Sequence, residues 1–497
     1  MIRAAGLKKN AILRQPIELA QAKLLGTRNI NIQLSAATPD AKLAIVDVLL
    51  MLDFQIRRKH ALLKEADLVA THLRTLFSVP GDRVYLQSGY PSEPIIAEAA
   101  FRQLADWSHQ KPGVLVDILN DNLTSGSGLL DCGEVGELQG RGLLWDAYRR
   151  GVEFDHANLK LPGCINYIAG CLLTTFFTML FVDQYANMIL DSNPDNINEG
   201  PTLREAFKTA RVRFTHFGRM ADETGTTTYA VWAAFMRCMA ISCRNGQLLV
   251  DCLVPILLWD EKLCEHVMSS ILVQFKRQKK GTIAKYSIDE KEVGFFPNVD
   301  YSDCTSHRFS LSPGSRPYIT LIMELSVQGP ASGDAVTNTK FFSNTQTKAK
   351  VNTKDKTKSG DTVPGPAARP TTPTGQNQQY TADAPSKVIP KAGNHHHERA
   401  GHPRYNIFAY GCSPAVYRGI DEEQKAGVAL LLRSRDFLGE HARQDAASIG
   451  AVRNMKPFWT GEEDCYHWVE CSRLRGGIVQ SIEGVFLEEQ IQEGELP

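Results

Sequence analysis

The sequence predicts a mixed helix-and-strand fold of the α/β class, with a helical N-terminal region and a core that contains strands. Apolar residues recur every three or four positions through much of residues 1–125, which is the period of an amphipathic helix. Beyond residue 246 the apolar runs become short and β-prone. A polar segment, residues 331–401, interrupts this strand-rich part and predicts a disordered insert.

Composition limits the functional classes. The 497 residues are 43% hydrophobic and 22% charged, as in globular proteins, and this length allows two or three domains. A formal net charge of zero gives the whole molecule no attraction for nucleic acid, so any phosphate-binding surface must be local. The eleven cysteines form no C-x-x-C pair, and the start MIRAAGLKKNAILRQ lacks the apolar run of a signal peptide. We therefore expect an intracellular protein, in the nucleus or the cytoplasm, with reduced cysteines.

Helices are predicted for the N-terminal region, residues 1–125. Residues 41–77 keep the helical period, and SGYPSEPIIAEAAF predicts a helix start with Ser92 as N-cap and Pro94 in the first turn. Another helix is predicted at residues 134–150, at the beginning of a core region that spans residues 126–330.

A helical insertion is predicted within that core, at residues 155–245. Its apolar run 166–182 is short and contains Asn and Thr, which favours a buried core helix over a membrane span, so no membrane partner is expected. His216 falls in this stretch on a predicted amphipathic helix. It is interpreted as a hydrogen-bonded core histidine rather than as a catalytic base.

Four strands are predicted at residues 247–258, 269–276, 317–328 and 404–411, each an apolar run bounded by Gly, Pro, Asp or Ser. Residues 331–401 cannot bury enough apolar surface to offset the entropy of ordering them. Because strand-like sequence resumes at Arg404, this segment is predicted to be a surface insertion within one domain, which residues 402–497 complete. The three histidines at 395–397 are interpreted as incidental rather than as metal ligands.

Polar residues in two of these strands are candidates for chemistry. In SILVQFK, Gln274 and Lys276 share one face of the strand, while Val273 and Phe275 take the other. Both faces are otherwise apolar, which is typical of a strand that is covered on both sides. A buried lysine without a partner is costly, so Lys276 needs a nearby anion or an opening to solvent.

Asp251 is equally unusual, because LLV precedes it and CLVPILL follows it. A connection of about ten residues leads to the next strand and predicts a hairpin that brings Asp251 close to Gln274 and Lys276. Pro255 indicates that the strand of Asp251 lies at an edge of the sheet or is bulged.

The order of an acidic residue in one strand and Q-x-K in the next resembles the restriction-endonuclease-like superfamily, known by its motif PD-(D/E)xK. The resemblance implies a restriction-endonuclease-like core and a glutamate from its first helix, for which Glu137 is the candidate ahead of Glu134. It implies that Glu137 and Asp251 bind Mg²⁺ and that Lys276 stabilises charge at the phosphorus.

Two residues depart from that motif. Val250 stands where the motif has proline, and Gln274 stands where it has an acid. An amide oxygen can bind Mg²⁺ but adds no negative charge, so Gln274 would assist the site less than a carboxylate would.

A broader resemblance covers most of the chain outside the insert. The segments GYPSEPIIAEAAF, GELQGRGLL, RFTHFGRMADE, VDCLVPILL, SSILVQFKRQ and NIFAYGCSPAVY are together similar to a group of uncharacterised fungal proteins. Longer members carry an ATPase and are compared with Crinkler-type or mobile-element proteins. This chain has no G-x-x-x-x-G-K-[ST] phosphate loop, so it resembles the helical and nuclease-like part without that ATPase.

Two further patterns in the sequence have simpler interpretations than a functional site. The basic residues Arg277, Lys279 and Lys280 follow the Q-x-K strand and are candidates for contacts with nucleic-acid phosphates, or else form a solvated turn. A zinc site made from Cys412 and residues 465, 467 and 471 is set aside, because the cysteine spacing is unlike that of known zinc motifs.

Two functions remain open on the sequence. The first is a Mg²⁺-dependent nuclease that cleaves DNA or RNA through Glu137, Asp251 and Lys276, with Gln274 assisting. The second is an inactive scaffold of the same fold that binds a protein partner, such as an ATPase, or nucleic acid. The sequence gives no oligomeric state.

Overall fold

The structure is a computed structural model. It describes residues 14–54, 59–79, 87–124, 135–160, 165–220, 225–243, 247, 249–258, 263–276, 288–296, 316–325, 335–337 and 402–433. All of them belong to one compact unit of the chain. The mixture of helices and strands confirms the predicted α/β class. No helix among the described residues is long and apolar enough to cross a membrane.

Helices are concentrated in the first half of the chain, where the apolar period predicted them. They are α2 (Pro39–Leu50), α3 (Lys59–Thr71), α4 (Pro94–Gln110), α5 (Val114–Thr124), α6 (Val135–Asn158), α7 (Leu173–Leu180), α8 (Asp183–Leu190), α9 (Leu203–Ala206), α10 (Thr228–Met236) and α11 (Gln424–Arg433).

Strands form one large sheet and one small hairpin. The hairpin pairs β1 (Thr75–Ser78) with β2 (Gln87–Gly89). The large sheet contains β3 (Cys171–Leu172), β4 (Arg211–Val212), β5 (His216–Arg219), β6 (Met239–Ser242), β7 (Cys252–Leu257), β8 (Met268–Lys276), β9 (Tyr318–Glu324), β10 (Ala335–Thr337) and β11 (Arg404–Tyr410).

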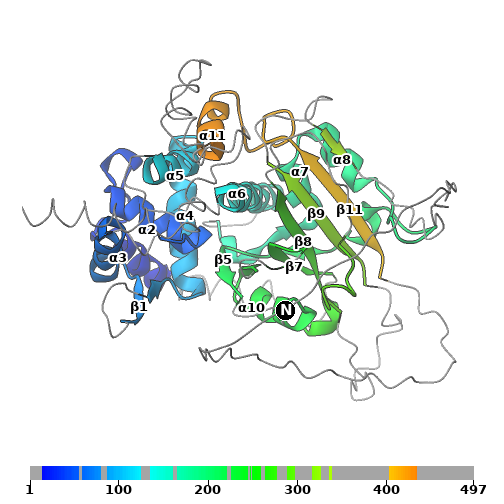
Figure 1. The fold of residues 1–497 in the computed structure, drawn as a ribbon, viewed down its shortest axis with the longest axis horizontal. Coiled ribbons are helices and arrows are strands. Elements are labelled where there is room, and N and C mark those ends of the chain that lie inside the picture. Colours follow the sequence, from blue (N-terminus) through cyan, green and yellow to red (C-terminus); the bar gives the residue numbers. More distant parts are fainter. Residues whose placement is uncertain are drawn as a thin grey trace, which may run out of the picture. The chain divides into compact units, whose positions relative to one another are not determined.

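All four predicted strands are present, as β7, β8, β9 and β11, and they are neighbours in the order β11-β9-β8-β7 (Figure 1). β7 and β8 form the expected antiparallel hairpin, with Cys252 opposite Val273. β9 runs parallel to both β8 and β11. β9 and β11 therefore lie side by side in one sheet, although the predicted insert separates them in the sequence.

Both faces of β8 are covered, as its apolar sequence predicted. Ile271, Val273 and Phe275 join a large hydrophobic core that continues through α6 into the N-terminal helices. Leu272 faces a smaller core, to which α10 contributes Val231. Helix α6 lies between the N-terminal helices and the sheet (Figure 1), so the N-terminal region shares the core of the sheet.

Several expectations about secondary structure are wrong. The N-terminal region contains the β1–β2 hairpin as well as helices. Ser92 is not the N-cap of α4, because that position belongs to Glu93, although Pro94 does occupy the first turn. The predicted single helix at 166–182 is divided into a short 3-10 turn, strand β3 and α7.

The predicted helical insertion at 155–245 contains four strands, β3 to β6, in addition to α7 to α10. His216 therefore lies on strand β5 rather than on a helix. β5 and β6 run parallel and extend the sheet beside β7. These strands have two to four residues each, which is too short for an alternating pattern to be recognised.

Pro255 does not mark an edge strand, because β7 has neighbours on both sides. On one side it pairs with β8 along its whole length. On the other side, β6 pairs with residues 252 and 253, and β4 pairs with residues 256 and 257. Pro255 falls between these two short partners, where the missing N–H removes no ladder hydrogen bond.

The predicted boundary of the insert is wrong by a few residues. Residues 335–337 lie inside the predicted segment 331–401, yet they form β10, which pairs with β11 in antiparallel orientation. The rest of that segment, including the histidines at 395–397, lies outside the described residues.

Candidate active site

Asp251 is held at the start of β7, where strands β6, β7 and β8 meet. Its N–H donates to the carbonyl of Val273 at 2.9 Å, and its own carbonyl accepts from the N–H of Cys243 at 2.8 Å. Its carboxylate Oδ2 accepts from the N–H of Phe275 at 2.7 Å. Cys252 also pairs with Val273, so Asp251 and Cys252 lie together opposite that residue, and the carboxylate of Asp251 reaches on to Phe275 in β8. The predicted juxtaposition of Asp251 and the Q-x-K strand is present.

Glu137 approaches from a different element, the first turn of α6. The helix can come this close to β8 because residue 140 is glycine. A Cβ on Gly140 would overlap the ring of Phe275. Glu137 lies one turn before this contact, so the close approach holds its carboxylate near the end of β8 and the start of β7.

The charges of these residues act on one another. Burial is the main cause that raises the pKa of Asp251, to about 6. The hydrogen bond from the N–H of Phe275 lowers that pKa, the negative charge of Glu137 raises it, and the positive charge of Lys276 lowers it. Asp251 therefore lies within electrostatic reach of both Glu137 on α6 and Lys276 on β8.

Gln274 contributes an unused acceptor. Its side chain is only 6% exposed, and its Oε1 has no hydrogen-bond partner among the described residues. Buried polar atoms without a partner are rare in proteins, and they often indicate a water, an ion or a ligand. Lys276, at the end of β8, is half-buried and lies beside Glu324 of β9 in the parallel register.

An oxygen-rich donor set of this kind suits Mg²⁺. Glu137 and Asp251 provide two carboxylates within electrostatic reach of each other, and Gln274 of β8 carries an amide oxygen without a hydrogen-bond partner among the described residues. Mg²⁺ prefers oxygen ligands, needs only one or two carboxylates, and keeps several waters. Within the described ranges, no three side chains of His, Cys, Asp or Glu gather closely enough to hold a metal by themselves. Two carboxylates are compatible with a Mg²⁺ ion that keeps several waters.

Cys243 is a neighbour that the sequence did not predict. Burial raises the pKa of its thiol to about 12, and the charges of Asp251 and Glu137 add to this effect. The thiol is therefore protonated at neutral pH and lines the acidic pair as an apolar group. Cys243 directly follows β6, a strand that was expected to be helix, so its approach to Asp251 had no signal in the sequence.

Other predicted residues fall outside this site or outside the described residues. Glu134 and the basic residues Arg277, Lys279 and Lys280 are not among the described residues. The same holds for residues 465, 467 and 471 of the zinc pattern, while Cys412 is buried.

His216 is a buried histidine that is hydrogen-bonded through both ring nitrogens, as the sequence predicted. Its Nε2 lies 2.8 Å from Oγ of Ser92, and its Nδ1 lies 3.1 Å from Oγ1 of Thr215. Burial, with a smaller effect from the charge of Arg237, lowers its pKa to about 3. A histidine that is neutral and hydrogen-bonded on both nitrogens at pH 7 is a weak base. Through its contact with Ser92, His216 joins the chain just before α4 to β5.

The comparison with known families covers the part of the chain that holds this geometry. Residues 35–292 match a family described as a domain of unknown function, DUF8736, and the match spans just over half of the chain. The chain belongs to this family. The DUF8736 region contains Glu137, Asp251, Gln274 and Lys276, and it ends before β9 and β11 begin. No curated protein and no solved structure matches the chain.

Proposed function

We propose that this member of the DUF8736 family is a Mg²⁺-dependent phosphodiesterase with a restriction-endonuclease-like core, and that it cleaves DNA or RNA. The observation that carries the proposal is the place of Asp251 at the open end of the β7–β8 hairpin, where its carboxylate accepts from the N–H of Phe275, next to Lys276, and is influenced by the charges of Glu137 and Lys276. A strand aspartate influenced by a helix glutamate and by a lysine of the next strand is consistent with the PD-(D/E)xK resemblance.

The chemistry of each group follows from its position. When bound, Mg²⁺ supplies an activated water and neutralises phosphate charge. Glu137 and Asp251 would hold the ion, and Gln274 would add its unpartnered Oε1 as a neutral ligand. Lys276, half-buried at the strand end, would stabilise the negative charge that develops on the phosphate oxygens.

Cleavage assays on single-stranded and double-stranded DNA and RNA, with Mg²⁺ or Mn²⁺, test the proposal. Wild-type protein should cleave at least one of these substrates. Asp251→Asn and Lys276→Met should each reduce the rate by about 100-fold or more, as removal of one charge-stabilising group does in other enzymes. Asp191→Asn and Lys425→Met are matched controls, since both side chains are exposed members of surface ion pairs. Wild-type protein that cleaves none of the four substrates would overturn the proposal.

Gln274 favours a second candidate function, an inactive scaffold. An amide in place of the motif's acid leaves the site with fewer negative charges than an active member of the superfamily has. A scaffold would bind nucleic acid or a protein partner, such as an ATPase, through the same fold. Folded wild-type protein that binds nucleic acid in EDTA, and that cleaves none of the four substrates, would favour this function over catalysis.

A further inference from the structure

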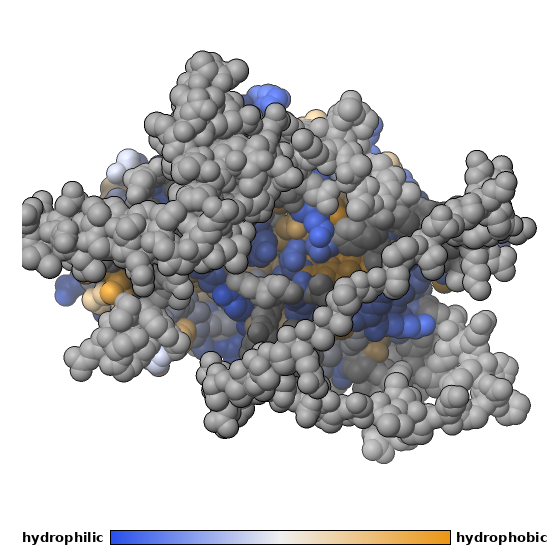
Figure 2. Space-filling view, viewed as in Figure 1, coloured by the Kyte–Doolittle hydropathy of each residue, from blue (hydrophilic) through white to orange (hydrophobic). Residues whose placement is uncertain are grey.

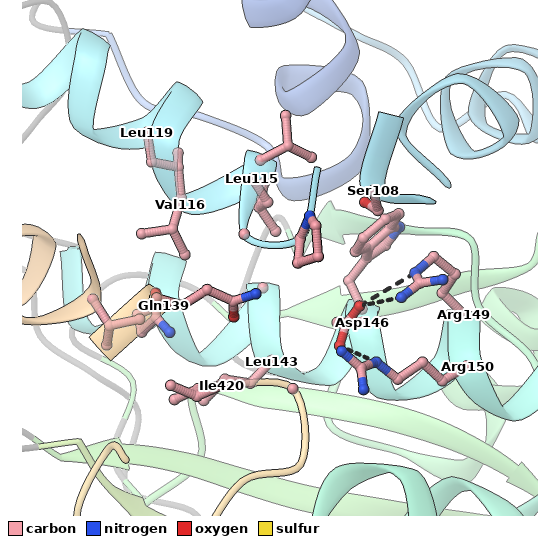
Figure 3. Close-up of a pocket in the computed structure, with 18 residues that line it drawn as sticks. Ser108, Leu115, Val116, Leu119, Gln139, Leu143, Asp146, Arg149, Arg150 and Ile420 are labelled. Atoms are coloured by element: carbon pink, nitrogen blue, oxygen red, sulfur yellow. Dashed lines mark hydrogen bonds and ion pairs between the residues drawn. The ribbon is translucent and has the colours of Figure 1, made fainter. Parts of the chain in front are cut away.

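The cavity between α5 and α6 does not select a charged ligand. It has a volume of about 110 Å³, and Figure 3 shows Asp146 bonded to both Arg149 and Arg150 at its charged end. Asp146 pairs with Arg150 at 2.7 Å, and Arg149 pairs with Glu153 at 2.8 Å. The acidic and basic groups described there balance, so the cavity offers a charged ligand no unpaired partner.

The β1–β2 hairpin is different, because it has an open strand edge and exposed apolar side chains. It follows α3 and is separate from the large sheet (Figure 1). Among the described strands, β1 pairs with β2 alone, so its other edge has no strand beside it. Leu76, Phe77 and Val79 are 42%, 60% and 48% exposed. An apolar strand with an open edge is a template for pairing with another chain.

A buried ionic network holds this hairpin in place. Arg74, directly before β1, pairs with Asp47 of α2 and Glu65 of α3, and all three side chains are at most 6% exposed. Nε of Arg74 also donates to Oγ of Ser88 in β2 at 2.9 Å, which ties the second strand to the same network. A two-stranded hairpin alone is only marginally stable, so this anchor makes the edge rigid. A rigid edge loses less conformational entropy when it binds a partner.

Phe77 projects from the hairpin at a bulge. The register of β1 and β2 shifts between Leu76 and Ser78, which leaves Phe77 without an opposite residue in β2. Its ring lies against Gly89, where a Cβ would come within 3.1 Å of Cε2, and most of the side chain is open to solvent. Replacement of Phe77 should therefore change the exposed surface more than the fold.

The chemistry of β1 fits another β-strand. An extended strand offers the row of N–H and C=O groups that pairs with a strand edge, whereas a helix uses these groups internally. Residues 75–79 carry no charge, and the guanidinium of Arg74 is buried and paired. The strand itself therefore gives nucleic-acid phosphates no positive group to bind.

We propose that β1 pairs with β1 of a second copy of this chain, in antiparallel orientation about a two-fold axis. This arrangement covers both open edges at once and joins the two hairpins into one four-stranded sheet, which is more stable than an isolated hairpin. Leu76 and Phe77 of each copy pack against apolar side chains of the other. Because the strand has no charge and the chain has a formal net charge of zero, two copies meet without net repulsion.

Sedimentation and hydrogen exchange, measured over a range of protein concentrations, test the proposal. The mass in solution should rise toward twice that of the monomer. The amides of residues 74–79 should gain protection in step with that rise, whereas those of α10 should not.

Phe77→Lys should weaken association by about tenfold or more, because it brings like charges together across the axis. Tyr229→Lys is the matched control, since it adds the same charge at a side chain that is also 60% exposed, and it should leave association unchanged. Melting curves establish that both variants are folded, and Leu76→Lys replaces Phe77→Lys if the latter melts early.

Protein that remains monomeric at all concentrations overturns the proposal. A dimer whose association and exchange pattern are the same in the β1 variant as in wild type also overturns it, because its interface would then lie elsewhere.

Discussion

Asp251 is ionised at neutral pH in a place that disfavours its charge. Burial raises its pKa from 3.8 to about 6, and Lys276 offsets only part of that shift. Proteins retain such groups at functional sites more often than elsewhere. A bound cation would remove the penalty, which is consistent with the proposed Mg²⁺ site.

The raised pKa predicts how stability changes with pH. A group whose pKa is higher in the folded protein than in the unfolded chain stabilises the fold at low pH and loses that contribution as the pH rises through the folded value. For Asp251 the window runs from about pH 4 to about pH 6. In EDTA at pH 7.5, Asp251→Asn should therefore be more stable than wild type by about 1–3 kcal/mol. At pH 4 the two should be equal.

Urea unfolding at the two pH values measures this difference. Asp191→Asn is the control, since Asp191 is exposed and should show little effect at either pH. A purely structural ion pair between Asp251 and Lys276 predicts the opposite sign, a loss of about 3–5 kcal/mol at pH 7.5, because the variant would leave a buried charge without its partner.

At the scale of elements, the site depends on how closely α6 lies against β8. Gly140 is the reason for that closeness, because any side chain there would overlap Phe275. The polar sequence around residues 134–150 predicted a helix but not its contact with a strand more than a hundred residues later. The structure thus adds the spacing between elements, which a single sequence does not contain.

Gly140→Ala should force α6 away from β8. We expect a destabilisation of about 1–3 kcal/mol from overpacking, together with loss of any Mg²⁺ binding that depends on Glu137. Gly142→Ala on the same helix is the matched control. Its Cβ would lie 3.1 Å from Cδ2 of Leu115, a flexible side-chain end, so its cost should be small and partly offset by better helix propensity. Thermal melting measures both, and equal melting temperatures for the two variants would contradict the role of Gly140.

Strand β6 was missed because the turn before it has no signal in the sequence. β6 follows α10 within one apolar stretch, and the break between them falls at Arg237 and Cys238. Cys238 has φ 55°, a left-handed conformation that usually indicates glycine, so nothing in the sequence signals the turn. In contrast, β7, β8, β9 and β11 are long apolar runs with turn residues at their ends, and these were predicted correctly.

At the scale of the whole molecule, tertiary contacts decide features that local pattern cannot. Ser92 was assigned to a helix cap, but it bonds to His216, 124 residues away in the sequence.

Large exposed apolar side chains are distributed over several elements, among them Phe77, Tyr229 and Met236. On the face drawn in Figure 2, hydrophilic residues make up much of the visible described surface, and apolar residues appear in small areas.

The sheet topology predicts that the segment between β10 and β11 is dispensable for folding. Because β10 runs antiparallel to β11, with Thr337 opposite Phe408, the chain leaving β10 already heads toward Arg404, and the connection must cover only about 13 Å of strand between these two positions. Replacement of residues 342–400 by a Gly/Ser linker of about 15 residues should satisfy this reach and keep β10 in place. The melting temperature should change by only a few degrees. A collapse of the transition would show that these residues contribute to the core.

The central claim is that Glu137 and Asp251, from α6 and β7, share one bound metal ion. Calorimetric titration of the wild-type protein with Mg²⁺ or Mn²⁺, repeated with Glu137→Gln and Asp251→Asn, tests it most directly. We predict one site in wild type and a loss of affinity of about tenfold or more in each variant, since each removes a charged ligand. Wild-type protein that binds neither ion, or affinity that is unchanged in both variants, would contradict the account.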